Sequence, residues 1–213
     1  MELAELADLI MSRRSVRSWK EQEVPENLLL KAVELATWAP NAGNQQNWHF
    51  YVVLDRKTIG AIADAAQARA DEIAAWPEQA TGAAYGRRQV FFRPAPALVA
   101  VAASPYRSPP DQIIAVRANT DPRAREMQEW RRSVDSGIQS VASAIATMLL
   151  VLHQMGLGTV WMTGPLQAKG DIEKIIGVPT GQNLAALVAV GYAAATPAAR
   201  PRRPLADVCT VVR

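Results

Sequence analysis

The stretch Ile138-Gln139-Ser140-Val141-Ala142-Ser143-Ala144-Ile145-Ala146-Thr147-Met148-Leu149-Leu150-Val151-Leu152 is the strongest apolar run of the sequence. Polar residues interrupt it, and it falls short of the roughly 18 apolar residues that cross a membrane, so it predicts a buried helix. Helical spacing extends over 123–155, and the pattern becomes almost wholly apolar after Val134. This implies burial on all sides, by the rest of the fold or by a second subunit. Gly156 is expected to end the helix.

Strands and helices alternate on both sides of this run. Apolar residues at helical spacing predict helices over 2–11, from Pro25 to Pro40, over 57–75 with Pro77 closing the segment, and over 167–176. Short apolar runs predict strands over 49–54, 97–103, 159–162 and 184–190. The segment 105–122 is expected to be the longest irregular piece, and 193–213 an extended arm of the kind that reaches a partner subunit. The pattern predicts one α+β domain over 1–213 with a central sheet.

Composition places the chain among ordinary globular proteins. It has 213 residues, of which 49% are hydrophobic and 20% charged, and its formal net charge is +3. These values argue against intrinsic disorder, and the single cysteine, Cys209, argues against a disulfide scaffold. The first residues carry Glu2, Glu5 and Asp8 rather than a basic region followed by an apolar one, so no signal peptide is expected. A cytoplasmic location without membrane association is the default expectation.

The positive charge is concentrated in clusters, two of which lie near the ends of the chain. Arg13, Ser15 and Arg17 alternate by two, so in an extended segment they can face one oxyanion, whose geometry matches guanidinium groups. The alternative is a solvated basic helix end that faces the helix dipole. Arg200 and Arg202 also face alike if Pro201 and Pro204 fix the backbone, the alternative being a soluble tail. Arg14 and Lys20 belong to the first of these clusters and Arg203 to the last, and two further pairs are Arg87 with Arg88 and Arg131 with Arg132.

Other candidate sites are weaker on their own. The amide-rich loop 41–47 can donate and accept hydrogen bonds at a heteroaromatic edge, or it can be a simple turn. Residues 156–165 lack the dinucleotide fingerprint, but their glycines let backbone approach a planar ring closely. His49 and His153 lack metal-ligand spacing, and Cys209 has no nearby histidine. Glu126 and Glu129 fit a solvated helix face, although either carboxylate can also meet a substrate. The chemistry is therefore expected to belong to a cofactor, and no nucleic-acid site is expected because the basic clusters lack interleaved aromatic residues.

Four segments, taken in order, resemble the nitroreductase family of FMN-dependent NAD(P)H oxidoreductases over essentially the whole chain. They are Arg13-Arg14-Ser15-Val16-Arg17, then Trp38-Ala39-Pro40-Asn41-Ala42-Gly43-Asn44-Gln45-Gln46-Asn47-Trp48-His49-Phe50, then His153 to Trp161, and finally Arg202-Arg203-Pro204-Leu205-Ala206-Asp207-Val208. The similarity is greatest to the small, minimal-type branch. Three positions depart from the family pattern: Asn41 replaces serine, Asn47 replaces proline, and Ala146 stands where many relatives carry glutamine.

The resemblance implies a mostly antiparallel central sheet flanked by helices and a homodimer in which the C-terminal arm reaches the partner subunit. It implies that residues from both chain ends hold the FMN phosphate and pyrimidine edge, that the loop serves the other subunit, and that strand residues line the flavin ring. The implied cofactor-binding residues are Arg13, Arg14, Ser15, Arg17, Asn41, Ala42, Asn44, Trp161, Met162, Thr163, Gly164, Arg200 and Arg202.

The implied activity is ping-pong hydride transfer through FMN, from NADH or NADPH to a small nitroaromatic or quinone-like acceptor. Within flavin chemistry, the alternatives are a flavin-destroying synthase, a dehalogenase, or an azoline or peptide dehydrogenase. From a different class, the alternative is a non-catalytic flavin- or anion-binding module. No residue of the chain is expected to be catalytic, and no metal is expected.

Overall fold

A four-stranded antiparallel sheet in the order β1-β2-β4-β3 forms the centre of the computed structural model, which describes residues 2–76, 90–195 and 197–213. The strands are β1 (Trp48–Val53), β2 (Ala97–Ala103), β4 (Asn183–Gly191) and β3 (Gly158–Met162). All four predicted strands are confirmed, and so is the predicted α+β class. β2 is buried along its whole length, because it is an interior strand covered on both faces. This explains why its residues are uniformly apolar rather than alternating.

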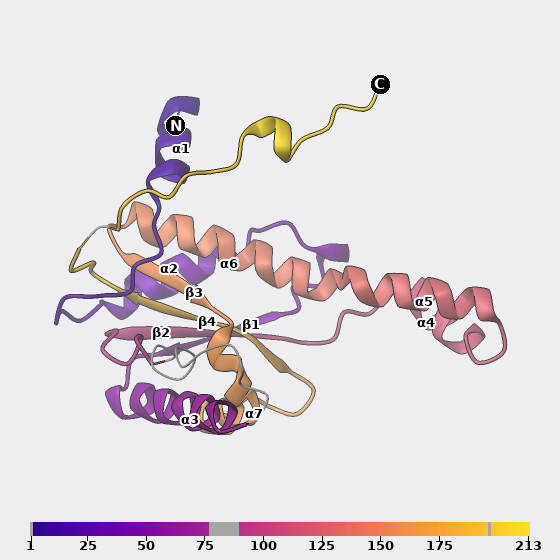
Figure 1. The fold of residues 1–213 in the computed structure, drawn as a ribbon, viewed down its shortest axis with the longest axis horizontal. Helices are drawn as coiled ribbons and strands as arrows, with labels where there is room; N and C mark the ends of the chain where they lie inside the picture. Colours follow the sequence, from indigo (N-terminus) through magenta and orange to yellow (C-terminus); the bar gives the residue numbers. More distant parts are fainter. Residues whose placement is uncertain (1, 77–89, 196) are drawn as a thin grey trace.

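Helices cover both faces of the sheet (Figure 1). On one face lie α2 (Glu26–Ala36) and α6 (Ser136–Gln154), and on the other lie α3 (Arg56–Ala74), α7 (Lys169–Ile176) and the 3₁₀ turn η3 (Gly164–Ala168). Side chains of β2 alternate between the two layers, since Leu98 packs in the α3 layer and Val99 in the α2–α6 layer. The helices predicted over 2–11, 25–40 and 57–75 are confirmed as α1 (Leu3–Ser12), α2 and α3. Pro77 and the pair Arg87 and Arg88 lie outside the described residues.

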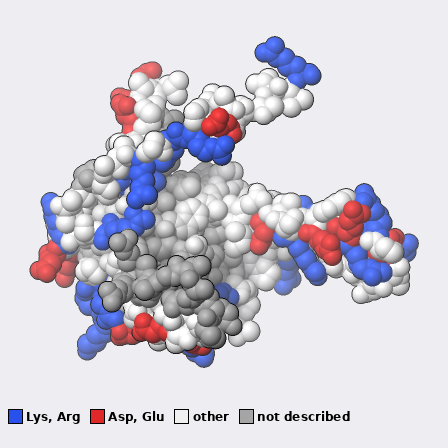
Figure 2. Space-filling model, in the orientation of Figure 1, with Lys and Arg blue, Asp and Glu red and all other residues white. Residues whose placement is uncertain are grey.

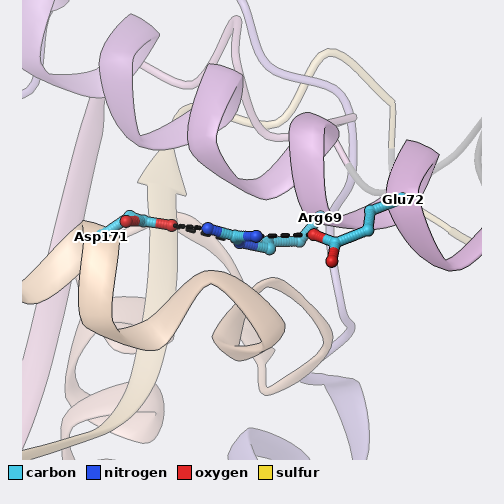
Figure 3. Close-up of polar contacts among 3 residues, drawn as sticks. All are labelled: Arg69, Glu72 and Asp171. Atoms are coloured by element: carbon cyan, nitrogen blue, oxygen red, sulfur yellow. Dashed lines mark hydrogen bonds and ion pairs between the residues drawn. The ribbon is translucent and has the colours of Figure 1, made fainter.

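A two-pronged ion pair ties α3 to α7 on the outside of their layer (Figure 3). The guanidinium of Arg69 donates to Asp171 Oδ2 from Nη2 at 2.9 Å and from Nε at 3.2 Å, and to Glu72 from Nη1 at 2.5 Å. The Arg69 side chain is 45% exposed, so water screens this contact. Ile59, Ile62 and Ile172 are fully buried, and burial of such apolar side chains stabilises the packing of these helices on the core.

The expectation of an irregular stretch over 105–122 is wrong, because this stretch contains α4 (Pro109–Arg117). Ser108 caps the helix by accepting a hydrogen bond from Asp111 N at 3.5 Å. Pro109 and Pro110 lie in the first turn, where a missing N–H removes no intrahelical bond. The two prolines that indicated a loop therefore mark a helix start.

The expectation of one continuous helix over 123–155 is also wrong. Asp135 adopts a left-handed conformation (φ 41°, ψ 71°) that ends α5 (Pro122–Val134), and its carboxylate accepts a hydrogen bond from Ile138 N at 3.0 Å to start α6. Together, α4 and α5 form a hairpin that projects away from the sheet (Figure 1).

Burial of α6 is one-sided within the chain. One face, including Val141, Ile145 and Met148, is fully buried against the sheet and α2, whereas Ile138 is 45% exposed and Ala146 is exposed. By length and composition 122–154 passes as a membrane span, but its buried stripe is that of a helix packed on a core. The described part of the chain therefore buries only one face of α6 and does not provide the expected burial on all sides.

Candidate functional site

The segment after α1 lies in extended conformation along the edge strand β3. Val16 N donates to Thr159 O at 2.9 Å, and Ser15 forms a parallel bridge with Thr159. The Val16 side chain points inward and is 5% exposed, and an added Cβ on Gly158 would lie only 2.7 Å from Val16 Cγ2. Because side chains alternate along extended backbone, Ser15 and Arg17 are directed away from this buried contact. The predicted alternation is confirmed for residues 15 and 17, whereas both Arg13 and Arg14 line the cavity described below.

Hydrogen bonds join the same segment to the chain that follows β4 through the main chain, and to the start of β3 through the Trp19 side chain. Lys20 N donates to Tyr192 O at 2.9 Å, Ala194 N donates to Ser18 O at 3.1 Å, and Trp19 Nε1 donates to Gly158 O at 3.0 Å. The pairing around Trp19 is antiparallel, so the chain beyond Ala194 runs back toward residues 13–17. Sequence reasoning missed this docking, because the contact joins residues that are 139 positions apart in the chain.

The two arginine clusters therefore line one cavity of about 500 Å³, which we call the arginine cavity. Figure 2 shows Lys and Arg side chains gathered where the arm leaves the body of the molecule. Among the described residues, the guanidinium groups of Arg13, Arg200 and Arg202 have no hydrogen-bond or ion-pair partner. Uncompensated cations around one cavity favour an oxyanion ligand. The lining contains five arginines and no acidic residue: Ile10, Met11, Arg13, Arg14, Ser15, Arg17, Pro197, Ala198, Ala199, Arg200 and Arg202.

Not every arginine near the cavity is free. Arg14 Nη1 donates to Met11 O at 2.5 Å and to Arg13 O at 2.9 Å, so its guanidinium caps the end of α1, as the helix-dipole alternative predicts. Arg17 Nη1 makes a long contact of 3.4 Å to Ser15 O, and its guanidinium lies 5.8 Å from the centre of the Phe91 ring. Arg203 Nη2 donates to Asp207 O at 2.8 Å and does not line the cavity.

His153, at the end of α6, links this segment to the helix. Its Nε2 lies 2.9 Å from Ser12 Oγ. Burial and, to a lesser degree, the nearby charges of Arg13 and Arg14 lower the pKa of His153 below the ordinary value of 6.5, because each disfavours the imidazolium. His153 is therefore a partly buried residue with a hydrogen-bond partner.

A second cavity, of about 350 Å³, adjoins the first and shares Arg13 and Ser15 with it. Its other lining residues are Leu149, Trp161 and Thr163, and the Trp161 side chain is 38% exposed. Met162 differs from the expectation, because its side chain is 5% exposed and packs in the α3 layer on the opposite face of β3. Only its backbone can line a ligand there, whereas Gly164 is exposed at the start of η3.

The amide-rich loop lies elsewhere on the same chain. Ala42 N, in the 3₁₀ turn η1 (Ala42–Asn44), donates to Ser140 Oγ at 3.0 Å, near the start of α6. The two cavities lie beside Leu149 and His153, nine and thirteen residues further along α6, which at 1.5 Å per residue is about 14–20 Å away. A single chain thus does not bring Asn41, Ala42 and Asn44 to the arginine cavity.

Other sequence candidates have structural explanations. Glu126 forms an ion pair with Arg123 on the exposed surface of α5, as a solvated face requires. Arg131 is held by Asp111, from Nε to Oδ1 at 2.7 Å and from Nη2 to Oδ2 at 3.2 Å. This pair lowers the pKa of Asp111, because the hydrogen bond from Arg131 favours the carboxylate. Cys209 is exposed on the arm, and the described residues contain no cluster of groups suited to a metal ion.

Comparison with known proteins agrees with these features. The family model described as "Nitroreductase family" matches residues 10–192. A putative NAD(P)H nitroreductase of Bacillus subtilis, YfhC, is 24% identical over 95% of this chain and 91% of its own length. The BluB-like flavoprotein of Clostridium difficile 630 superimposes with a TM-score of 0.87 at 27% identity, over 100% of both chains. An oxidised iodotyrosine deiodinase bound to FMN and 3-iodo-L-tyrosine shares the fold, with a TM-score of 0.72 and 24% identity over 98% of this chain and 97% of its own.

Proposed function

From the premise that the chain belongs to the nitroreductase family, we propose that it is an FMN-dependent oxidoreductase that uses NAD(P)H to reduce nitroaromatic or quinone-like acceptors. The observation that carries the proposal is the arginine cavity, in which Arg13, Arg200 and Arg202 from opposite chain ends present unpaired positive charge. A phosphate monoester carries the complementary charge and geometry. The adjoining cavity beside Trp161 provides room for a planar ring next to that phosphate site.

The residues present fit FMN in this arrangement. Arg13, Ser15, Arg200 and Arg202 would hold the phosphate, while Trp161, Thr163 and the backbone at Gly164 would lie along the ring. Bound FMN supplies hydride acceptance from NAD(P)H and hydride donation to the acceptor. The chain contributes binding, orientation and charge, since positive groups beside the cofactor favour its anionic forms. Trp161 lines the cavity and is partly exposed, so we expect solvent and the two substrates to reach the cofactor from this side in turn.

The proposed active unit is a homodimer. In one chain, the loop 41–44 and the arginine cavity lie about 14–20 Å apart along α6. A second copy that covers the open face of α6, whose residues include Ile138 and Ala146, would supply the missing loop. The C-terminal arm supports the same arrangement, because Leu205, Val208, Val211 and Val212 are all at least 60% exposed in the isolated chain.

The first experiment is an absorbance spectrum of the purified protein, followed by titration with FMN and then, without oxygen, with NADPH. We expect a yellow flavin spectrum that NADPH bleaches and an acceptor restores. Arg200→Ala and Arg202→Ala should each weaken FMN binding about tenfold, because each removes a charge-assisted contact. Arg203→Ala is the matched control, since Arg203 lies outside the cavity and bonds Asp207 O. Colourless protein that does not bind FMN would refute the proposal.

A specialised flavin enzyme, such as a flavin-destroying synthase, a dehalogenase or an azoline or peptide dehydrogenase, is the second candidate. It is favoured by the similarity over the full chain to a BluB-like flavoprotein and by the shared fold with a deiodinase. Steady-state turnover of NADPH with a nitroaromatic acceptor separates the two candidates. Sustained turnover supports the first, whereas flavin reduction without turnover supports the second. A non-catalytic anion-binding module would instead bind polyanions with steep salt dependence and ignore FMN.

A further inference from the structure

Two amide side chains in the loop before β1 hold the base of the α4–α5 hairpin. Gln45 makes a reciprocal pair with the main chain of Arg107: its Nε2 donates to Arg107 O at 2.5 Å, and Arg107 N donates to its Oε1 at 3.0 Å. Asn47 Nδ2 donates to Ser104 O at 3.0 Å and to Gly137 O at 3.4 Å. The first set of contacts lies where the chain enters the hairpin, and Gly137 lies where the chain leaves it. One loop therefore makes hydrogen bonds to the chain on both sides of the hairpin.

The contact around Asn47 is buried and tightly packed. Asn47 is 7% exposed, and Ser104 N donates to its main-chain O at 2.7 Å. A Cβ on Gly137 would lie 3.1 Å from Asn47 Nδ2 and 3.2 Å from Tyr106 Cβ, so only glycine fits without movement. Removing the amide donor would leave the carbonyls of Ser104 and Gly137 without this hydrogen-bond partner.

The hairpin has few other attachments to the body. α4 buries none of its residues and α5 buries only Ala124. The two helices pack against each other and are braced by the two-pronged pair between Arg131 and Asp111. Figure 1 shows the hairpin projecting beyond the end of the sheet. A stiff unit fixed mainly at its base takes its orientation from that base.

The same loop, residues 41–47, also contains the residues proposed to contact the flavin. Within four positions, Gly43 (φ 60°), Asn44 (φ 50°) and Gln46 (φ 46°) adopt left-handed backbone. Such conformations in non-glycine residues cost free energy and persist only where the surroundings enforce them. The conformation that presents Asn44 is thus linked through the same few residues to the contacts of Gln45 and Asn47.

We propose that Gln45 and Asn47 are positioning residues that couple the loop 41–47 to the α4–α5 hairpin, so that the order of the hairpin depends on whether flavin occupies the loop. The flavin dependence rests on the function proposed above. The coupling itself is a property of the chain and can be measured without cofactor.

Hydrogen–deuterium exchange of the full chain, with and without saturating FMN, tests the coupling. The variants are Asn47→Asp, which keeps the size but loses the donor, and Gln45→Ala, which is on the surface and should fold. Without FMN, both should raise exchange of the α4 and α5 amides about fivefold, the effect of one lost hydrogen bond, while β2 and β4 amides stay unchanged. Gln46→Ala is the matched control, because its side chain bonds only Asn44 within the described residues.

In the wild-type protein, FMN should slow hairpin exchange about fivefold or more, and in Asn47→Asp this response should shrink to less than about twofold. Lowering the pH should partly restore the response in Asn47→Asp, because a protonated carboxyl can again donate to a carbonyl. Hairpin exchange that does not change in either variant would overturn the coupling. So would equal protection by FMN in wild type and variants. If FMN does not bind, the proposed function fails and the flavin dependence fails with it, while the comparison without FMN still decides whether the two amides hold the hairpin.

Discussion

Replacing Gly158 by alanine tests whether docking of residues 13–17 on β3 organises the arginine cavity. The new Cβ would lie 2.7, 2.9 and 3.0 Å from Val16 Cγ2, Cβ and Cγ1, which is closer than carbon atoms approach without strain. Forcing an extra methyl group into such a packed contact costs about 1–3 kcal/mol. For a chain of this length, that corresponds to a fall in Tm of about 2–12 °C. Because Val16 N bonds Thr159 O, relief of the clash displaces Ser15 and weakens FMN binding as well.

The assay is thermal unfolding monitored by circular dichroism, combined with FMN titration, in a double-mutant cycle with Val16→Ala. Val16→Ala alone costs about 2 kcal/mol from its lost methyl groups. Because it also removes two of the three clashing atoms, the double variant should be less destabilised than the sum of the single variants by about 1 kcal/mol. Gly170→Ala is the control, since its Cβ would meet nothing within 4 Å and alanine favours the helix. Strict additivity, or unchanged FMN affinity in Gly158→Ala, would refute the reasoning.

Four further outcomes are expected. Arg69→Ala should leave the free energy of unfolding in urea titrations nearly unchanged, because its ion pairs are about half exposed and water screens them. Asp55→Ala should lower the free energy of unfolding more than Arg69→Ala does in the same assay, because the carboxylate caps α3 by accepting a hydrogen bond from Thr58 N at 2.8 Å. The pKa of His153 is lower in the folded state than its ordinary value of 6.5, so the folded state binds fewer protons than the unfolded state, and the stability should fall as the pH drops below 6.5. His153→Gln should make Tm less dependent on pH in this range. Ala146→Glu, on the open face of α6, should give a monomer in sedimentation analysis if the proposed dimer forms there.

The sheet could be predicted from the sequence because its strands are short and strongly patterned. Ala97–Ala103 is apolar at every position, and it is the strand covered on both faces. The helix boundary at Asp135 could not be predicted from periodicity, because helical spacing continues across it. There the decisive feature is local: one aspartate takes left-handed backbone and caps the next helix with its side chain. The prolines of α4 were misread for a related reason, since proline breaks a helix interior but suits its first turn.

The sequence indicated that arginines of this chain bind an oxyanion, but it could not predict which arginines lie together in the arginine cavity. Alternation at Arg13, Ser15 and Arg17 indicated one oxyanion, yet nothing in the local pattern placed Arg200 beside it. The connection comes from long-range contacts, in which Trp19 bonds Gly158 O and the main chain at Ser18 pairs with Ala194. Similarly, spacing alone could not tell that Arg14 would cap α1 or that Met162 would face the α3 layer. Which side of a strand faces a ligand depends on register, and register is set by the partner strands.

The largely apolar character of α6 has a physical reason once both ends of the helix are considered. Its start holds the loop through Ser140, and its end holds the segment before the arginine cavity through His153. Ala146 lies about midway between them and is exposed. In the proposed dimer, a two-fold axis near Ala146 would run two α6 helices in opposite directions, which brings the loop of one copy to the cavity of the other. A small residue at the crossing lets the helices approach closely, and an apolar surface on the uncovered side is what such a contact requires. The face of α6 that is exposed in one chain is therefore the face that would complete the site in the proposed dimer.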